Sequence, residues 1–131
     1  MKRFFLTVMT AMVLPFTAFA DDPLPVEVWV CDYKEGKTLA DLEGWYDEFN
    51  ELSDKMDNPD FEAWIWTPFF ADLEMADVLA VTSFPDLESM GQSMMEFFGG
   101  EETGALFERY QSIVDCTGRD LWMVQQMRKR D

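Results

Sequence analysis

The chain has 131 residues, with 26 Asp and Glu against 10 Lys and Arg, no His, two Cys and 15% aromatic residues. A formal net charge of −16 argues against sequence-independent binding to nucleic acid or to an anionic membrane, because both need a basic patch. Without histidine the chain cannot build a Ser/His/Asp or Cys/His nucleophile, or a metal site with a His ligand.

Residues 1–20 have the pattern of a cleaved secretory signal peptide. Lys2 and Arg3 precede an apolar run from Phe4 to Phe16, and the small-x-small sequence Ala18-Phe19-Ala20 follows. Cleavage after Ala20 would leave residues 21–131 as a single domain, with 8 basic against 26 acidic residues and a net charge of −18. We therefore expect a periplasmic or secreted protein that contacts no membrane once the leader is removed.

The first half of the remaining chain predicts a strand followed by a helix. Residues 26–33 alternate, with Val26, Val28 and Val30 on one face and Glu27, Trp29, Cys31 and Tyr33 on the other. Thr38 and Asp41 have the spacing of a capping box, which opens a helix running to about Met56. The apolar residues of that helix recur at three- and four-residue steps: Leu39, Leu42, Trp45, Tyr46, Phe49 and Leu52.

The second half predicts two strands, a broken helix and a last strand. Residues 61–67 and 77–84 have strand patterns, and Pro85-Asp86 suits the start of a helix. Gly99-Gly100 breaks this helix, and a second helical piece follows as far as Val114. Residues 121–127 alternate again and form the predicted last strand.

The order β-α-β-β-α-β, with the second helix broken in two, predicts an α+β ferredoxin-like domain with an antiparallel four-stranded sheet. In the usual strand order 4-1-3-2, the first and last strands are antiparallel neighbours. Cys31 lies near the end of the first strand and Cys116 just ahead of the last, so this topology brings the two cysteines together. We expect a structural disulfide, because the chain is exported and the spacing is not that of a redox Cys-x-x-Cys pair.

Helices cover one face of such a sheet and leave the other open. If Val26, Val28 and Val30 meet the helices together with Ala63 and Ile65, the open face carries a large apolar set: Trp29, Trp64, Trp66, Leu79, Val81, Trp122 and Val124. With the registers reversed, the open face is still apolar. Soluble monomers rarely expose a patch of this size, so we expect a homodimer in which a second copy covers it. The alternative is that residues 69–76 or 99–104 fold across it.

The element order, the apolar second face and the segment Ser83-Phe84-Pro85-Asp86-Leu87-Glu88-Ser89-Met90 resemble the dimeric α+β barrel superfamily. Its members include antibiotic-biosynthesis monooxygenase-like proteins, which hold an aromatic substrate with pocket Asn, Trp and sometimes His. Asn50 and Asn58 fall on a helix end and a turn, so the resemblance carries over only the tryptophans as candidate ligand-binding residues: Trp29, Trp64, Trp66 and Trp122.

The sequence therefore predicts a small acidic exported domain that is non-enzymatic, dimerises and binds an apolar or aromatic small molecule through a Trp-lined sheet face. A cofactor-independent monooxygenase-like enzyme on the same barrel and a protein-interaction module are the alternatives. We identify no catalytic residue, cofactor or metal site: the oxygen-rich turn at Asp54, Asp57, Asn58 and Asp60 fits a helix stop, and Glu101-Glu102 fit the first turn of a helix.

Overall fold

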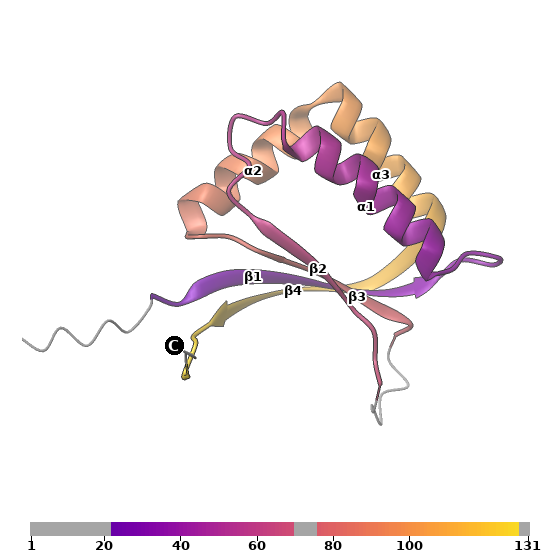
Figure 1. Ribbon diagram of the computed structural model, residues 1–131, viewed down its shortest axis with the longest axis horizontal. Helices are drawn as coiled ribbons and strands as arrows, with labels where there is room; N and C mark the ends of the chain where they lie inside the picture. The colour runs from indigo at the N-terminus through magenta and orange to yellow at the C-terminus, as the bar shows by residue number, and fades with distance from the viewer. Residues whose placement is uncertain (1–21, 70–75, 129–131) are drawn as a thin grey trace, which may run out of the picture.

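The computed structural model describes residues 22–69 and 76–128 (Figure 1). The predicted signal peptide and most of the connection at 69–76 lie outside these residues. The elements in chain order are β1 (Leu24–Tyr33), α1 (Leu39–Ser53), β2 (Glu62–Trp66), β3 (Val78–Ser83), α2 (Leu87–Gly99), α3 (Glu101–Ile113) and β4 (Val114–Val124).

The four strands form one antiparallel sheet in the order β2-β3-β1-β4, and the three helices lie on one side of it (Figure 1). This is the ferredoxin-like arrangement, with its second helix divided into α2 and α3. The predicted element order and strand order are confirmed.

The predicted helix starts are also confirmed. The backbone N–H of Thr38 donates to the carboxylate of Asp41 at 2.9 Å, as a capping box requires. Asp86 is the N-cap of α2, and its carboxylate accepts from the backbone N–H of Ser89 at 2.7 Å. Gly100 separates α2 from α3, and Glu101 and Glu102 lie in the first turn of α3.

The last strand differs from its prediction. It begins at Val114, directly after α3, and ends at Val124, whereas the alternation pattern placed it at 121–127. The reason is pairing: β4 follows β1 along its whole length, from Val114 opposite Tyr33 to Val124 opposite Leu24. A register shift beside Val30 interrupts this ladder and disturbs the alternation in the sequence.

Cys31 and Cys116 are directly opposed on β1 and β4, and the structure joins them in a disulfide with the Sγ atoms 2.04 Å apart. The topology thus brings the two cysteines together as predicted. Cys31 is fully buried and belongs to the main core, which lies between the sheet and the helices α1 and α3.

The register settles which face the helices cover. The covered face carries Trp29 and Cys31 of β1, together with Ala80 of β3 and Ile65 of β2. The opposite face, which we call the open face, carries Leu24, Val26, Val28, Val30, Trp64, Trp66, Leu79, Val81, Trp122 and Val124. The valines of β1 therefore lie on the opposite face from Ala63 and Ile65, so the first of the two alternatives, in which both sets meet the helices, does not occur.

Candidate functional site

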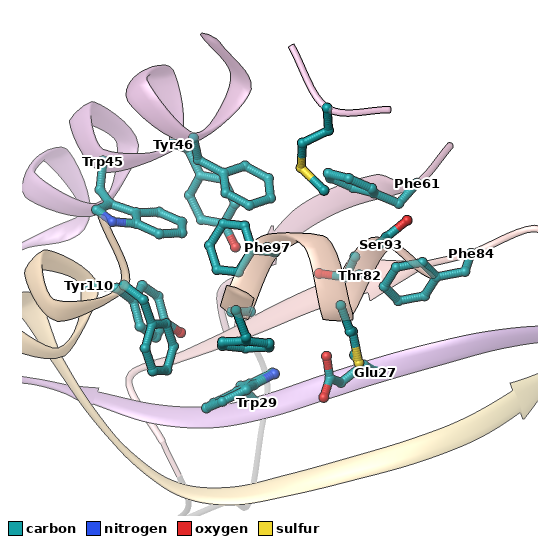
Figure 2. Close-up of a pocket in the computed structure, with 16 residues that line it drawn as sticks. Glu27, Trp29, Trp45, Tyr46, Phe61, Thr82, Phe84, Ser93, Phe97 and Tyr110 are labelled. Atoms are coloured by element: carbon teal, nitrogen blue, oxygen red, sulfur yellow. The ribbon is translucent and has the colours of Figure 1, made fainter. Parts of the chain in front are cut away.

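A cavity of about 100 Å³ lies between the covered face of the sheet and the helices, beneath α2 (Figure 2). We call it the α2 cavity. Ten of its 16 lining residues are aromatic. The lining consists of Glu27, Trp29, Trp45, Tyr46, Phe49, Met56, Phe61, Ala80, Thr82, Phe84, Ser93, Met94, Phe97, Phe98, Phe107 and Tyr110.

Helical spacing builds the upper wall of this cavity. Trp45 and Phe49 are one turn apart on α1, and Phe107 and Tyr110 are one turn apart on α3. The α2 helix adds Phe97, which lies among these rings in Figure 2. The alternation of β1 and β3 builds the floor, since every second residue of each strand points toward the helices.

The aromatic rings of the cavity walls contact one another. Trp45 stacks on Phe49 with centroids 5.2 Å apart and lies 4.9 Å from Tyr110. Phe49 also meets Phe97 edge-on at 5.7 Å. Offset and edge-on contacts of this kind stabilise beyond the area that they bury, so the cavity has preformed walls.

The α2 helix covers the cavity without packing deeply on the sheet. Ser93 is its one buried residue, and its hydroxyl donates to the backbone carbonyl of Asn58 at 2.7 Å. Glu96 accepts from the backbone N–H groups of Asp57 at 2.7 Å and of Asn58 at 3.1 Å. Polar contacts with the turn after α1 therefore hold this helix in place.

Several polar groups of the cavity wall already have partners. The indole N–H of Trp45 donates to the carbonyl of Leu106 at 2.8 Å. The hydroxyl of Tyr110 lies 3.3 Å from the sulfur of Cys31 and 3.5 Å from that of Cys116. These contacts connect one wall of the cavity to the disulfide.

Glu27 is the acidic residue of the lining, and only 6% of it is exposed. Its carboxylate forms an ion pair with Nε of Arg119 on β4. The Arg119 guanidinium also lies over the ring of Trp29, 4.7 Å from its centroid, and reaches the sulfur of Met94 at 3.7 Å. Arg119 is not among the lining residues, although it contacts two of them, Trp29 and Met94.

Burial raises the pKa of Tyr46 to about 12. The pKa of Tyr110 is also raised, mainly by burial and further by the nearby Tyr46 and the negative charge of Glu27. Both hydroxyls therefore stay protonated at neutral pH, where they can donate hydrogen bonds but are poor general bases.

The structure divides the four tryptophans that the sequence proposed as one ligand site. Trp29 lies on the covered face and lines the α2 cavity. Trp64, Trp66 and Trp122 lie on the open face, with 41%, 51% and 59% of their surfaces exposed. The four tryptophans therefore belong to two separate surfaces of the domain.

Neither the cavity nor Glu27 was predicted from the sequence, although the sequence carries a signal for Glu27. Glu27 alternates with Cys31 and Trp29 on one face of the first strand. A disulfide that closes a small domain is normally buried, so Cys31 marks that face as the covered one. Glu27 would then have stood out as an acidic residue pointing into the interior, which is rare without a partner.

Two further observations concern the described part of the chain. Among residues 22–69 and 76–128, no three His, Cys, Asp or Glu side chains gather as a metal ion would require. No helix in those same ranges is both long enough and apolar enough to cross a membrane.

No protein-family model and no curated protein matches this chain. Among solved structures, it is similar to a dimeric protein of unknown function and ferredoxin-like fold from Bacteroides fragilis NCTC 9343, at 8% identity and a TM-score of 0.44, over 79% of this chain and 96% of that one. It is also similar to a chlorite dismutase-like protein, at 13% identity and a TM-score of 0.44, over 76% of this chain and 42% of that one. Because both TM-scores are below 0.5, we base the fold assignment on the strand order described above and not on these two similarities.

Proposed function

We propose that this protein is an exported, non-enzymatic domain that binds a small apolar or aromatic molecule in the α2 cavity. One observation carries the proposal: an aromatic cavity of about 100 Å³ lies beneath α2, a helix in which Ser93 is the only buried residue. An apolar cavity of about 150 Å³ takes up benzene, so the smaller α2 cavity has room for at most a single aromatic ring.

A binding experiment with toluene tests this proposal. We expect ligand-observed NMR to show saturation transfer from the oxidised protein to toluene. Thr82→Leu should abolish the transfer, because a larger side chain on the cavity floor would occupy the volume of the ring. Thr67→Leu, at an exposed site just past β2, should leave it unchanged. Toluene transfer that survives Thr82→Leu would place the binding elsewhere and contradict the proposal.

Binding has more support than catalysis, because the raised pKa values of Tyr46 and Tyr110 make these hydroxyls poor bases. Toluene cannot test the monooxygenase-like alternative, because inserting one oxygen atom of O₂ needs two electrons that neither toluene nor the described residues supply. Hydroquinone is an aromatic molecule that can itself give two electrons to O₂, so an oxygen electrode with hydroquinone tests the alternative. Oxygen uptake at the rate of buffer alone would agree with a binding role, and faster uptake would favour the enzyme.

We infer that the open face joins two copies of the chain. The central residues Val26 and Val81 are already buried in the single chain, whereas the edge strands β2 and β4 expose three tryptophans: Trp64, Trp66 and Trp122. Aromatic residues are enriched in protein interfaces. A two-fold copy of the same face would cover the exposed tryptophans, as in the dimeric barrel that the sequence suggested.

The oligomeric state tests this inference. We expect light scattering to give a dimer, and Trp122→Asp to give a monomer with an intact fold. Met95→Asp serves as the control, since Met95 is 72% exposed but lies on α2, on the other side of the sheet. A wild-type monomer at micromolar concentration would count against the dimer and favour another protein as partner.

Export is the third part of the proposal. A disulfide between the two cysteines is compatible with an extracellular or periplasmic location. Mass spectrometry of the protein produced with its leader should find Asp21 as the first residue. An N-terminus at Met1 in the exported fraction would contradict the proposed cleavage.

A further inference from the structure

Glu27 gives the α2 cavity a chemical preference. The residue is 94% buried by surface, yet its carboxylate belongs to the cavity lining. Arg119 is its ion-pair partner, and Nε reaches one carboxylate oxygen, Oε1. No hydrogen bond from the described residues reaches the other oxygen. An ionised carboxylate can accept about four hydrogen bonds, so Glu27 keeps acceptor capacity that a ligand could use.

Among the described residues that line the cavity, Glu27 is the one with a charged side chain. Tyr46 and Thr82 also line the cavity, and their hydroxyls have no hydrogen bond with the described residues. A hydroxyl both donates and accepts, so these two groups do not select a cation.

Three further polar groups of the lining have partners. The hydroxyl of Ser93 and the indole N–H of Trp45 are bound to backbone carbonyls. The hydroxyl of Tyr110 contacts the disulfide. A molecule that donates a hydrogen bond to Glu27 would satisfy the buried carboxylate, whereas an anion would meet a negative charge there.

The aromatic walls favour a cation in the same place. Ring faces attract cations within about 6 Å. The guanidinium of Arg119 occupies one face of Trp29, 4.7 Å from its centroid, and the other nine aromatic rings of the lining have no such contact among the described residues. Trp29 and Glu27 lie side by side on the floor of the cavity in Figure 2. The chain's net charge of −16 also raises the local concentration of cations at its surface.

We propose that the α2 cavity selects a small aromatic amine, with its ring among the aromatic walls and its protonated amino group on the free oxygen of Glu27. This inference rests on the proposed binding function and specifies its ligand class. Arg119 competes with such a ligand for the same carboxylate. Its side chain is 47% exposed, so water screens much of its charge from the cavity.

The decisive experiment compares matched ligands on the wild-type protein at pH 7. Benzylamine and benzyl alcohol have nearly the same size and shape, and they differ in charge. We expect isothermal titration calorimetry to show that benzylamine binds at least about tenfold more tightly than benzyl alcohol, because a hydrogen bond between two charged groups is stronger than one from a neutral hydroxyl. Benzoate, the anionic counterpart, should bind more weakly than benzyl alcohol.

Two variants assign the preference to the carboxylate. Glu27→Gln should bring the two affinities within about twofold of each other, whereas Glu62→Gln, on the open face, should leave the preference intact. Arg119→Gln should tighten benzylamine binding severalfold, because it removes the competing cation. Glu27→Gln is therefore expected to weaken benzylamine binding and Arg119→Gln to tighten it. A general loss of structure would weaken binding in both variants, so opposite changes in affinity identify ligand recognition.

The outcomes distinguish the two proposals. Equal affinities for benzylamine and benzyl alcohol, or tighter binding of benzoate, would overturn the amine preference and leave the binding function standing. Binding of none of these ligands, nor of toluene, would overturn the binding function itself. If Glu27→Gln does not fold, the wild-type ligand pair and the sign of the Arg119→Gln effect still decide the inference.

Discussion

The two ends of the helix layer are built differently. At one end, α1 and α3 pack on the sheet around the disulfide, and Leu42 and Leu106 are fully buried. At the other end lies α2 (Figure 1). It buries only Ser93 and lines the α2 cavity. We call these the packed end and the cavity end. The contrast teaches that a small domain can concentrate its buried contacts in one region and leave a cavity in another.

The largest expected effect is loss of the disulfide. Replacing Cys31 and Cys116 with Ser opens a loop whose ends are 85 residues apart, which should cost about 4 kcal/mol of unfolding free energy by chain entropy. Urea unfolding of the variant and of the wild type measures this difference. A loss below about 1 kcal/mol would mean that packing alone holds the packed end, and the contrast between the ends would weaken.

A matched pair of truncations compares the two ends directly. Leu106→Ala removes a fully buried side chain from the packed end and should cost about 3 kcal/mol. Phe98→Ala, in α2, truncates a side chain that is 46% exposed and should cost about 1 kcal/mol or less, although it deletes more atoms. Equal losses by urea unfolding would show that the cavity end is as tightly coupled to the fold as the packed end.

Titration of the tyrosines at alkaline pH tests how completely the helix layer buries their side chains. Burial raises the pKa of Tyr46 to about 12 in the folded protein, whereas an unfolded chain titrates near 10.0. Above pH 10 the unfolded chain loses the Tyr46 proton before the folded protein does. The contribution of protonated Tyr46 to the free energy of unfolding is therefore present in full below pH 10 and is lost as the pH rises toward 12. Absorbance of tyrosinate should therefore increase late in the folded protein, and Tyr46→Phe should remove one of the late steps. Titration of all three tyrosines near pH 10 in the folded protein would contradict this burial.

The smallest expected effect concerns Glu96, which fastens α2. Backbone hydrogen bonds from Asp57, then the side chain and backbone of Asn58, lower the pKa of Glu96 below its ordinary value of 4.5. Its contribution is therefore present above pH 4.5 and is lost as the pH falls through the lowered pKa.

Hydrogen exchange provides the measurement. On acidification from pH 5, the amides of α2 should lose protection before those of α3. Glu96→Gln should remove part of this pH dependence, whereas Glu88→Gln, at an exposed position on the same helix, should keep it. Simultaneous loss of protection in α2 and α3 would show that the two ends open as one unit.

Local patterns predicted most of the fold. Alternation revealed β1, β2 and β3, helical spacing revealed α1, and the pair Thr38 and Asp41 marked its start. The strand order followed from the element order, and it placed Cys31 opposite Cys116. The start of β4 escaped prediction, because a strand that directly follows a helix and carries a register shift shows no clean alternation at its start.

The site was harder to predict, because it depends on packing between elements. Sequence alternation placed Trp29 and Val28 on opposite faces of the strand, but alternation alone did not indicate which of the two faces the helices. The ion pair between Glu27 and Arg119 joins residues 92 positions apart, and only the pairing of β1 with β4 brings them into contact. A cavity forms where the side chains of different elements leave space unfilled, and a local sequence pattern does not predict where this happens.

The break at Gly100 has a consequence for how this domain could change over evolutionary time. It makes α2 a separate segment that supplies Ser93, Met94, Phe97 and Phe98 to the cavity, while α3 carries the buried contacts. Substitutions in α2 can therefore reshape the cavity at little cost to folding. The same segment is the natural place to diversify a library when ligands are sought for this scaffold.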